Sequence, residues 1–378
     1  MRSGFVVRTR VIHGLLASGL GLGLMVTAPI DGAVTPGWRQ AAPGYSFSFP
    51  RDHASHPDYR LEWWYYTGNL STAEGHRFGY QLTFFRVGVN YRPDNPSRWA
   101  VRDLFMTHLA ISDLNGSRHY FAERFNRAGP GWARAAADTY HVWNQGWEVR
   151  LDSRGSHCLR AADEAIGLDL TLDPGKAPVL HGEGGYSRKG SDPGNASNYY
   201  SLTRMPTRGT IRVNGESARV EGLSWMDHEF GTTFLDKQQT GWDWFSIQLE
   251  DGRDIMLFEL RRSDGSADPH SGGTLLDARG GCAPIGAASF KMGPSRPWRS
   301  AATGASYPLE WRIDIGHKLE LTVRSALEDQ ELRPELSGIA YYEGAVNVEG
   351  TDGGKPVRGR GYLEMTGYAG SPMGTLLQ

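Results

Sequence analysis

The stretch that decides the fold is Leu104–Arg124, LFMTHLAISDLNGSRHYFAER, in which Asn115 and Gly116 separate two runs rich in apolar residues. An Asn-Gly pair accepts the positive φ angles that a tight hairpin turn requires. Alternating apolar and polar residues on both sides of such a turn are typical of paired β-strands. The stretch therefore predicts an antiparallel hairpin with strands at Leu104–Ser112 and Arg118–Arg124.

The same signal recurs along the chain and predicts three further hairpins. The first joins strands at Thr210–Val213 and Ser217–Trp225 through Asn214-Gly215. The second joins Trp242–Leu249 and Asp254–Leu260 through Asp251-Gly252. The third joins Ala345–Val348 and Val357–Glu364 through Asp352-Gly353-Gly354. Phe78–Val89 is another strand candidate, and Gly131–Thr139 is a short, Ala-rich, helix-like stretch or a loop insert. Many hairpins with few helices predict an all-β fold, as a sandwich or as closed barrels. Two barrel-sized blocks fit, at 41–233 and 234–378.

Composition agrees with this fold class and excludes others. The chain has 378 residues, 39% of them hydrophobic, with 49 glycines and an aromatic fraction of 11%. It is long enough for two domains and too apolar for general disorder. Its 40 basic and 42 acidic residues leave a net charge of −2. A nucleic-acid partner that needs a large basic face is therefore not expected.

The N-terminus is typical of a targeting segment. Arg2, Arg8 and Arg10 precede an apolar run at 11–30, and the first acidic residue is Asp31. This pattern predicts a signal peptide at 1–33 and a periplasmic or secreted protein. The alternative is an uncleaved helix that anchors the chain to the membrane, since about 20 apolar residues can span a bilayer.

Two cysteines, Cys158 and Cys282, are the only thiols in the chain. Export would permit a disulfide between them, but nothing in the local sequence indicates pairing. We expect two separate thiols, and no Cys or His spacing indicates a structural zinc site.

Strand alternation assigns the residues of two aromatic motifs to opposite faces. In Glu62–Tyr66, Glu62 shares one face with Trp64 and Tyr66, and Trp63 and Tyr65 lie on the other. Because both faces carry aromatic residues, the strand is expected to be covered on both sides. The second motif, Trp225–Glu229, places Trp225, Asp227 and Glu229 together and turns Met226 and His228 the other way; His108 falls among apolar neighbours and is expected in the interior.

Several segments resemble the AttH-like family of lipocalin-like proteins, which is related to the carotenoid 1,2-hydratases. The opening signature lies at 49–70, and the others are Thr107–Asp113, Trp225–Gly231, Tyr341–Val346 and Gly359–Tyr368. Together they span nearly the whole chain after the targeting segment. The resemblance implies two consecutive lipocalin-like antiparallel β-barrels, in agreement with the hairpins.

The resemblance also implies a chemistry. Members of the hydratase branch add water to a terminal double bond of an acyclic carotenoid, and other exported members are described as predicted secreted hydrolases. The hydratase residues, a His-x-Trp pair and a later Tyr-x-Asp pair, fall near Asn198 and Tyr200 and on Trp225 and Asp227. Only the aspartate keeps its identity in this sequence.

Hydration of an unactivated alkene needs a proton donor, a placed water and a site that tolerates positive charge. A carboxyl group buried among aromatic rings suits the donor, and ring faces stabilise a cation by about 0.5–2 kcal/mol. The candidate catalytic residues are Asp227, Glu62 and His108. The candidate ligand-binding residues are Trp64, Tyr66, Tyr200, Trp225 and Glu229.

For Asp227 the sequence leaves a structural alternative, in which the ionised carboxylate pairs with an arginine such as Arg86. As the acid, Asp227 would have its pKa raised by Glu229, which lies two residues away on the same face.

Other functions remain open at this level. We predict no cofactor and no metal, because Asp227 and His228 point to opposite faces of one strand. A hydrolase lacks support, since no Gly-x-Ser-x-Gly elbow is present. The non-catalytic alternative is a carrier of a small apolar ligand such as a lipid, terpenoid or polyene, working with a membrane-associated transporter.

Overall fold

The computed structural model describes residues 37–93, 95–97, 99–233 and 235–370. The predicted signal peptide at 1–33 lies outside these residues. Among the residues described, no helix is both long and apolar enough to cross a membrane. Helical structure in the same residues is limited to two 3-10 segments, η1 (Arg51–His53) and η2 (Ala287–Ser289), so the fold is all-β as expected.

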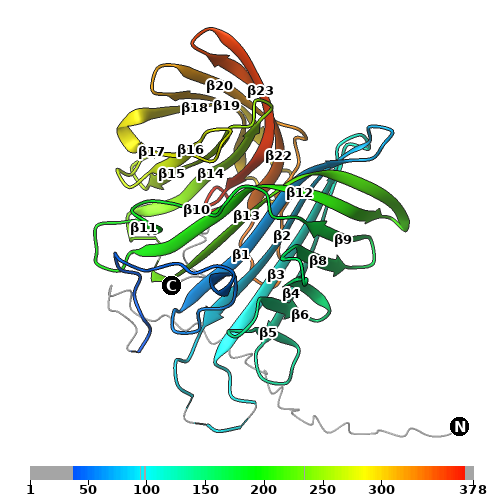
Figure 1. Ribbon diagram of the computed structural model, residues 1–378, viewed down its shortest axis with the longest axis vertical. Coiled ribbons are helices and arrows are strands. Elements are labelled where there is room, and N and C mark those ends of the chain that lie inside the picture. Colours follow the sequence, from blue (N-terminus) through cyan, green and yellow to red (C-terminus); the bar gives the residue numbers. More distant parts are fainter. Residues whose placement is uncertain (1–36, 94, 98, 234, 371–378) are drawn as a thin grey trace, which may run out of the picture. The chain divides into compact units, whose positions relative to one another are not determined.

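The first antiparallel sheet is formed by the strands up to Thr233 (Figure 1). These strands are β1 (Leu61–Ser71), β2 (Arg77–Gly88), β3 (Asp103–Asp113), β4 (Arg118–Arg127), β5 (Ala133–Ala135), β6 (His141–Asn144), β7 (Trp147–Leu151), β8 (His157–Ala162), β9 (Ile166–Leu172), β10 (Val179–Leu180), β11 (Tyr186–Arg188), β12 (Ala196–Val213) and β13 (Glu216–Thr233). Their main order is β4-β3-β2-β1-β13-β12-β9-β8-β7-β6-β5.

Side chains join the two ends of this order and curl the sheet into a barrel. Asn144 on β6 donates a hydrogen bond to Thr107 Oγ1 on β3 at 3.0 Å, and Asn126 on β4 donates to Asn144 Oδ1 at 2.6 Å. The barrel interior is filled by a large apolar cluster that includes Trp64, Trp147 and other buried aromatic and aliphatic side chains.

The second antiparallel sheet follows directly in the chain. Its strands are β14 (Gln239–Leu249), β15 (Asp254–Arg262), β16 (Gly272–Leu276), β17 (Cys282–Gly286), β18 (Phe290–Arg299), β19 (Ser306–Ile315), β20 (Leu319–Ser325), β21 (Glu331–Leu332), β22 (Tyr341–Asp352) and β23 (Lys355–Met365). The order β17-β16-β15-β14-β23-β22-β20-β19-β18 surrounds a separate core of aromatic and aliphatic residues, and both sheets are barrel-like.

All four predicted hairpins are confirmed, as β3–β4, β12–β13, β14–β15 and β22–β23. The helix-like interpretation of Gly131–Thr139 is wrong, because Ala133–Ala135 pairs with β6 as a short strand. An alanine run of this length is too short to nucleate a helix, and Gly131 enters it with φ +95°. Cys158 and Cys282 are both free.

The two sheets pack against each other where β1, β2, β3 and β12 of the first sheet meet β14, β22 and β23 of the second. An aromatic cluster between them contains Tyr65, Tyr199 and Trp225 from the first sheet and Trp244 and Tyr362 from the second. Residues from Gly37 onward form one compact unit, so the predicted domain limits at 41–233 and 234–378 stay a prediction. This contact between the sheets positions the candidate site.

Candidate active site between the two sheets

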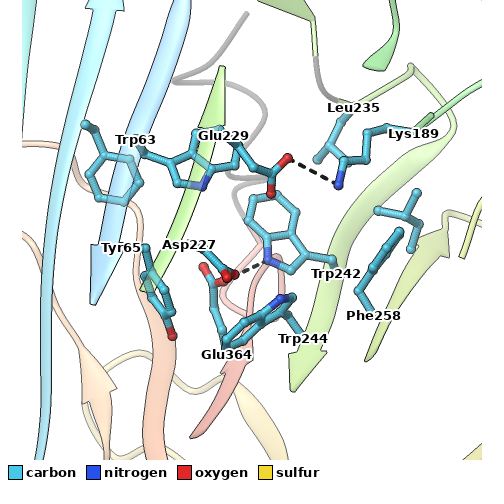
Figure 2. Close-up of a pocket in the computed structure, with 12 residues that line it drawn as sticks. Trp63, Tyr65, Lys189, Asp227, Glu229, Leu235, Trp242, Trp244, Phe258 and Glu364 are labelled. Atoms are coloured by element: carbon cyan, nitrogen blue, oxygen red, sulfur yellow. Dashed lines mark hydrogen bonds and ion pairs between the residues drawn. The ribbon is translucent and has the colours of Figure 1, made fainter. Parts of the chain in front are cut away.

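A cavity opens between the two sheets (Figure 2). Eight of its twelve lining residues are aromatic or aliphatic and four are charged. The apolar ones are Trp63, Tyr65, Phe85, Leu235, Trp242, Trp244, Phe258 and Leu260, and the charged ones are Lys189, Asp227, Glu229 and Glu364. Mostly apolar pockets with a few convergent polar groups are typical of small-molecule sites.

Strand alternation explains which motif residues reach the cavity. Asp227 and Glu229 lie on the face of β13 that looks toward the second sheet, whereas Met226 packs in the first barrel. On β1, Trp63 and Tyr65 line the cavity in the same way. The predicted assignment of faces is therefore confirmed for both motifs.

Asp227 is 3% exposed and is held by three donors. Tyr199 Oη donates to its Oδ2 at 2.7 Å, Trp225 Nε1 donates to its Oδ1 at 2.6 Å, and Ser201 also donates to Oδ1. Burial raises the pKa of Asp227 to about 7, against these three hydrogen bonds, and Glu229 adds the smallest of the named effects. Burial, rather than Glu229, is therefore the main cause of the raised pKa.

The alternative that paired Asp227 with Arg86 is wrong. Arg86 lies on β2, directly opposite Glu62 of β1 in the strand register, and binds Glu62 at 3.1 Å and Asp103 at 3.0 Å. Within the described part of the chain, Asp227 makes no ion pair at all, because strand alternation turns it away from the guanidinium.

Glu229 has a different environment from Asp227. Its Oε2 lies 3.3 Å from Lys189 Nζ and accepts a hydrogen bond from Ser197 (Figure 2). The Lys189 ammonium also lies over the rings of Phe258, at 4.5 Å, and Tyr199, at 5.0 Å. Glu229 and Lys189 thus form a compensated ion pair at one side of the cavity.

Glu364 enters the cavity from β23. Trp242 Nε1 donates to its Oε2 at 3.1 Å, the second contact drawn in Figure 2. Burial raises the pKa of Glu364 to about 8, Trp242 acts in the opposite direction, and Asp227 and Glu229 raise it further. A group with this pKa is largely protonated at neutral pH.

Chemically, the cavity offers a carboxylic acid, a nearby carboxyl group that titrates near neutral pH, and several ring faces. Pairs of carboxyl groups whose surroundings raise their pKa values are typical of acid–base sites. The faces of Trp63, Trp244 and Tyr65 are positioned to contact a substrate on which positive charge develops.

Glu62 lies on the other face of β1, away from the cavity. It accepts hydrogen bonds from Ser55 at 2.7 Å, His56 Nδ1 at 2.8 Å, His228 Nε2 at 3.0 Å and Arg86 Nε at 3.1 Å. Burial would raise its pKa, but Arg86, His228 and His56 hold the pKa of Glu62 well below the usual range.

This cluster does not fit a metal ion, although His56, Glu62 and His228 have ligand atoms within 4.8 Å of one another. The carboxylate lone pairs already accept protein donors, and the Arg86 cation would repel a second cation beside Glu62. The geometry is that of an ionised anchor that ties η1 and its following loop to the barrel.

His108 is also buried, at 1% exposure, but it does not line the cavity. Its Nδ1 lies 2.6 Å from the Tyr341 hydroxyl on β22, so it joins the two sheets. Burial lowers the pKa of His108 to about 3, which keeps the ring neutral.

Three of the predicted ligand-binding residues, Trp64, Tyr66 and Tyr200, pack inside the first barrel and not against the cavity. Trp225 stands behind Asp227 and donates to it, and Glu229 lines the cavity. The structure therefore gathers only part of the predicted set, and the roles of the others stay predictions.

Sequence reasoning missed Lys189 and Glu364, as well as the aromatic residues of β14 and β15. Glu364 lies in the closing segment that carries the family resemblance, and Trp242 and Trp244 alternate along one strand. Those signals were available, but nothing local indicates that β23 and β14 meet β13.

Comparison with known proteins supports this fold. A sequence model of the AttH-like family matches residues 40–368. Kievitone hydratase from Fusarium solani subsp. phaseoli is 24% identical over 211 residues, 54% of this chain and 58% of that protein. The chain thus matches little more than half the length of that relative. The dehydratase asqC from Emericella nidulans is 25% identical over 68% of this chain and 75% of its own length.

Two solved structures show the same architecture. An AttH-type protein from Nitrosomonas europaea is 36% identical, covers 87% of this chain and 99% of its own, and superposes with a TM-score of 0.80. Kievitone hydratase from Nectria haematococca is 18% identical, with 85% and 92% coverage and a TM-score of 0.68, which shows a shared fold.

Proposed function

This chain belongs to the AttH-like family, and on that premise we propose that it is a hydro-lyase. It adds water across a carbon–carbon double bond of an apolar small molecule held between its two sheets, or forms such a double bond by removing water. The observation that carries the proposal is the pair of carboxyl groups with raised pKa, Asp227 and Glu364, in an aromatic cavity. The relatives named as a hydratase and a dehydratase support the reaction class.

The two carboxyl groups have different roles in this mechanism. Glu364, with the higher pKa, gives its proton to one carbon of the double bond. Asp227 accepts three protein hydrogen bonds, which stabilise its anion, so it suits the base that orients a water and takes its proton. The acid role that the sequence suggested for Asp227 thus passes to Glu364.

The proton balance closes over one turnover. Glu364 loses a proton as the new C–H bond forms, and Asp227 gains one as water forms the C–O bond. The proton on Asp227 then passes through water to Glu364, which restores both groups. Dehydration follows the reverse path, as microscopic reversibility requires.

The substrate class follows from the cavity walls. Ring faces of Trp63, Tyr65 and Trp244 favour an apolar molecule and stabilise positive charge at the reacting carbon. The Lys189–Glu229 pair offers an edge where one polar group of the substrate can bind.

The test is turnover of unsaturated apolar probes, kievitone among them, by the purified full chain in ¹⁸O-labelled water. We expect a product that carries one labelled oxygen. Asp227→Asn and Glu364→Gln should each lower the rate by at least about 100-fold, while the exposed control Glu320→Gln should not. Wild-type rates in both site variants would overturn the assignment.

A non-catalytic carrier is the second candidate, and the apolar cavity lining supports it. Quenching of tryptophan fluorescence by the same probes separates the two functions, because Trp63, Trp242 and Trp244 line the cavity. Binding without turnover of any probe would favour the carrier.

Export to the periplasm or the medium, through the segment 1–33, and delivery of the ligand to a membrane-associated transporter remain part of the proposal. Their support is the sequence pattern alone. Detection of a mature N-terminus close to residue 34 in an exported fraction would test export.

A further inference from the structure

Behind Glu364 lies a second carboxyl group that does not line the cavity. Glu343 on β22 is directly opposite Glu364 on β23 in the strand register. Side chains opposite each other in antiparallel strands have Cβ atoms about 4.5–5.5 Å apart and lie on the same face. The two carboxyl groups are therefore within reach of one another.

No compensating cation accompanies this pair. In the ranges that the structure describes, neither Glu343 nor Glu364 makes an ion pair, and Glu343 is 1% exposed. Its named partner is the Tyr65 hydroxyl, which donates to Oε2 at 2.9 Å. Two carboxylates facing each other without a cation are destabilising, so at least one proton must be retained.

We propose that Glu343 is held as a neutral carboxylic acid that donates a hydrogen bond to Glu364 at the wall of the cavity. Glu343 is a positioning residue in this arrangement. When Glu364 gives up its proton, the Glu343 hydroxyl stabilises the carboxylate that forms. Its link to turnover rests on the proposed function, whereas its hydrogen bond to Glu364 does not.

The surroundings of the pair support the neutral state of Glu343. Burial raises the pKa of Glu343 well above its usual range, Glu364 raises it further, and Tyr65 has the opposite effect. The titratable groups that face the pair are Tyr65 from β1, Asp227 and Glu229 from β13, Tyr341 from β22, Tyr362 from β23, and His108 from β3 through its contact with Tyr341. The Lys189 ammonium forms its ion pair with Glu229. It therefore does not compensate a negative charge on Glu343 or Glu364.

Infrared titration of the full chain with ¹³C-labelled glutamate tests the proposal without any substrate. The protonated carboxyl band of Glu364, assigned by its loss in Glu364→Gln, should titrate in the alkaline range. Glu343→Gln keeps a hydrogen-bond donor and should leave that midpoint nearly unchanged. Glu343→Leu removes the donor and should raise the midpoint by about one pH unit.

The opposite result is equally clear. If Glu343 were ionised, both substitutions would remove a negative charge and lower the midpoint for Glu364, which would overturn the proposal. Absence of turnover in the hydratase assay leaves this titration unaffected, so the two failures are distinguishable. With an active probe, Glu343→Gln should retain the rate and Glu343→Leu should lose it, while Glu320→Leu is the exposed control.

Discussion

Asp227 and Glu62 show at the residue scale that burial alone does not decide the charge of a carboxyl group. Both are buried on the central strands of one sheet, but they face opposite ways. Glu62 meets Arg86 and two histidines and is ionised. The three donors that bind Asp227 are neutral, so burial raises its pKa to about 7 and the group titrates near neutral pH. The chemistry of the site depends on this difference in partners.

Asp227→Asn should gain stability relative to the wild type as pH rises. The folded wild type retains the Asp227 proton up to about pH 7, while the unfolded chain releases it near pH 4. Wild-type stability therefore falls as pH rises through that window, and the Asn variant lacks this loss. The difference between pH 4 and pH 8 should be on the order of 3 kcal/mol. Urea unfolding of the wild type and the variant at both pH values measures this difference. The same change in the free energy of unfolding at pH 4 and pH 8 would contradict a raised pKa of Asp227.

The rate of the hydro-lyase reaction should have a bell-shaped dependence on pH. Asp227 must be deprotonated and Glu364 protonated, which gives a rising limb near pH 7 and a falling limb near pH 8. The limbs belong to the coupled pair rather than to either residue alone. Initial rates between pH 5 and pH 10 check this, and Glu364→Gln should abolish the falling limb in its residual activity.

At the scale of elements, β1 and β13 act as a shared wall with a different function on each side. Their register pairs Tyr65 with Asp227 and Trp64 with His228. One face completes the first core, and the other carries the cavity. A strand buried on both faces tolerates no slip of register, because a shift of one residue turns every side chain to the opposite face. Such a shift would turn Glu62 into the cavity and Trp63 into the first barrel.

The approach of β2 to β22 controls how closely the two sheets pack. A Cβ placed on Gly79 would lie 2.7 Å from Ala345 Cβ. Gly79→Val should therefore force the sheets apart and cost about 1–3 kcal/mol of stability. Gly286→Val is the matched control, since Gly286 is exposed, extended and has nothing within 4 Å of its Cβ position. Chemical denaturation of both variants tests the prediction, and equal losses would show that the contact between sheets is not the cause.

For the whole molecule, the contacts between the sheets are too extensive for independent halves. Buried Asp254 on β15 binds Lys176 at 2.8 Å and Arg204, both of which precede β14 in the sequence. Tyr65, Trp225 and Trp244 pack in the same interface. Polar and apolar contacts therefore link the two cores, although each core is separate.

A fragment that ends at Thr233 should not fold to a soluble native state. It would expose Trp225, Tyr199 and Tyr65, and would leave Arg204 without Asp254. The intact chain should unfold in a single calorimetric transition, because each half stabilises the other. Two resolved transitions, or a fragment with sharp, dispersed NMR signals, would favour the domain limits predicted from the sequence.

Removal of residues 1–33 should leave a soluble, folded protein, as expected for a signal peptide. A longer deletion, of residues 1–40, also removes Trp38, which is 4% exposed and packs on Tyr91 and beneath Arg102. The longer deletion should lower the free energy of unfolding by about 3 kcal/mol. Thermal unfolding compares the two, and insolubility of the shorter deletion would contradict the signal-peptide assignment.

The sequence by itself determined the hairpins, the all-β class, the family and the face to which each residue of β1 and β13 points. These properties depend on turn chemistry and on a two-residue period, both of which are local. Only the tertiary structure decided that Asp227 shares a cavity with Glu364 and Lys189, that Arg86 binds Glu62 instead, and that Tyr66 and Tyr200 fill a closed core. Those outcomes depend on which strands pair within a sheet and which pack across the two sheets, and contacts between side chains far apart in the sequence leave no periodic signal.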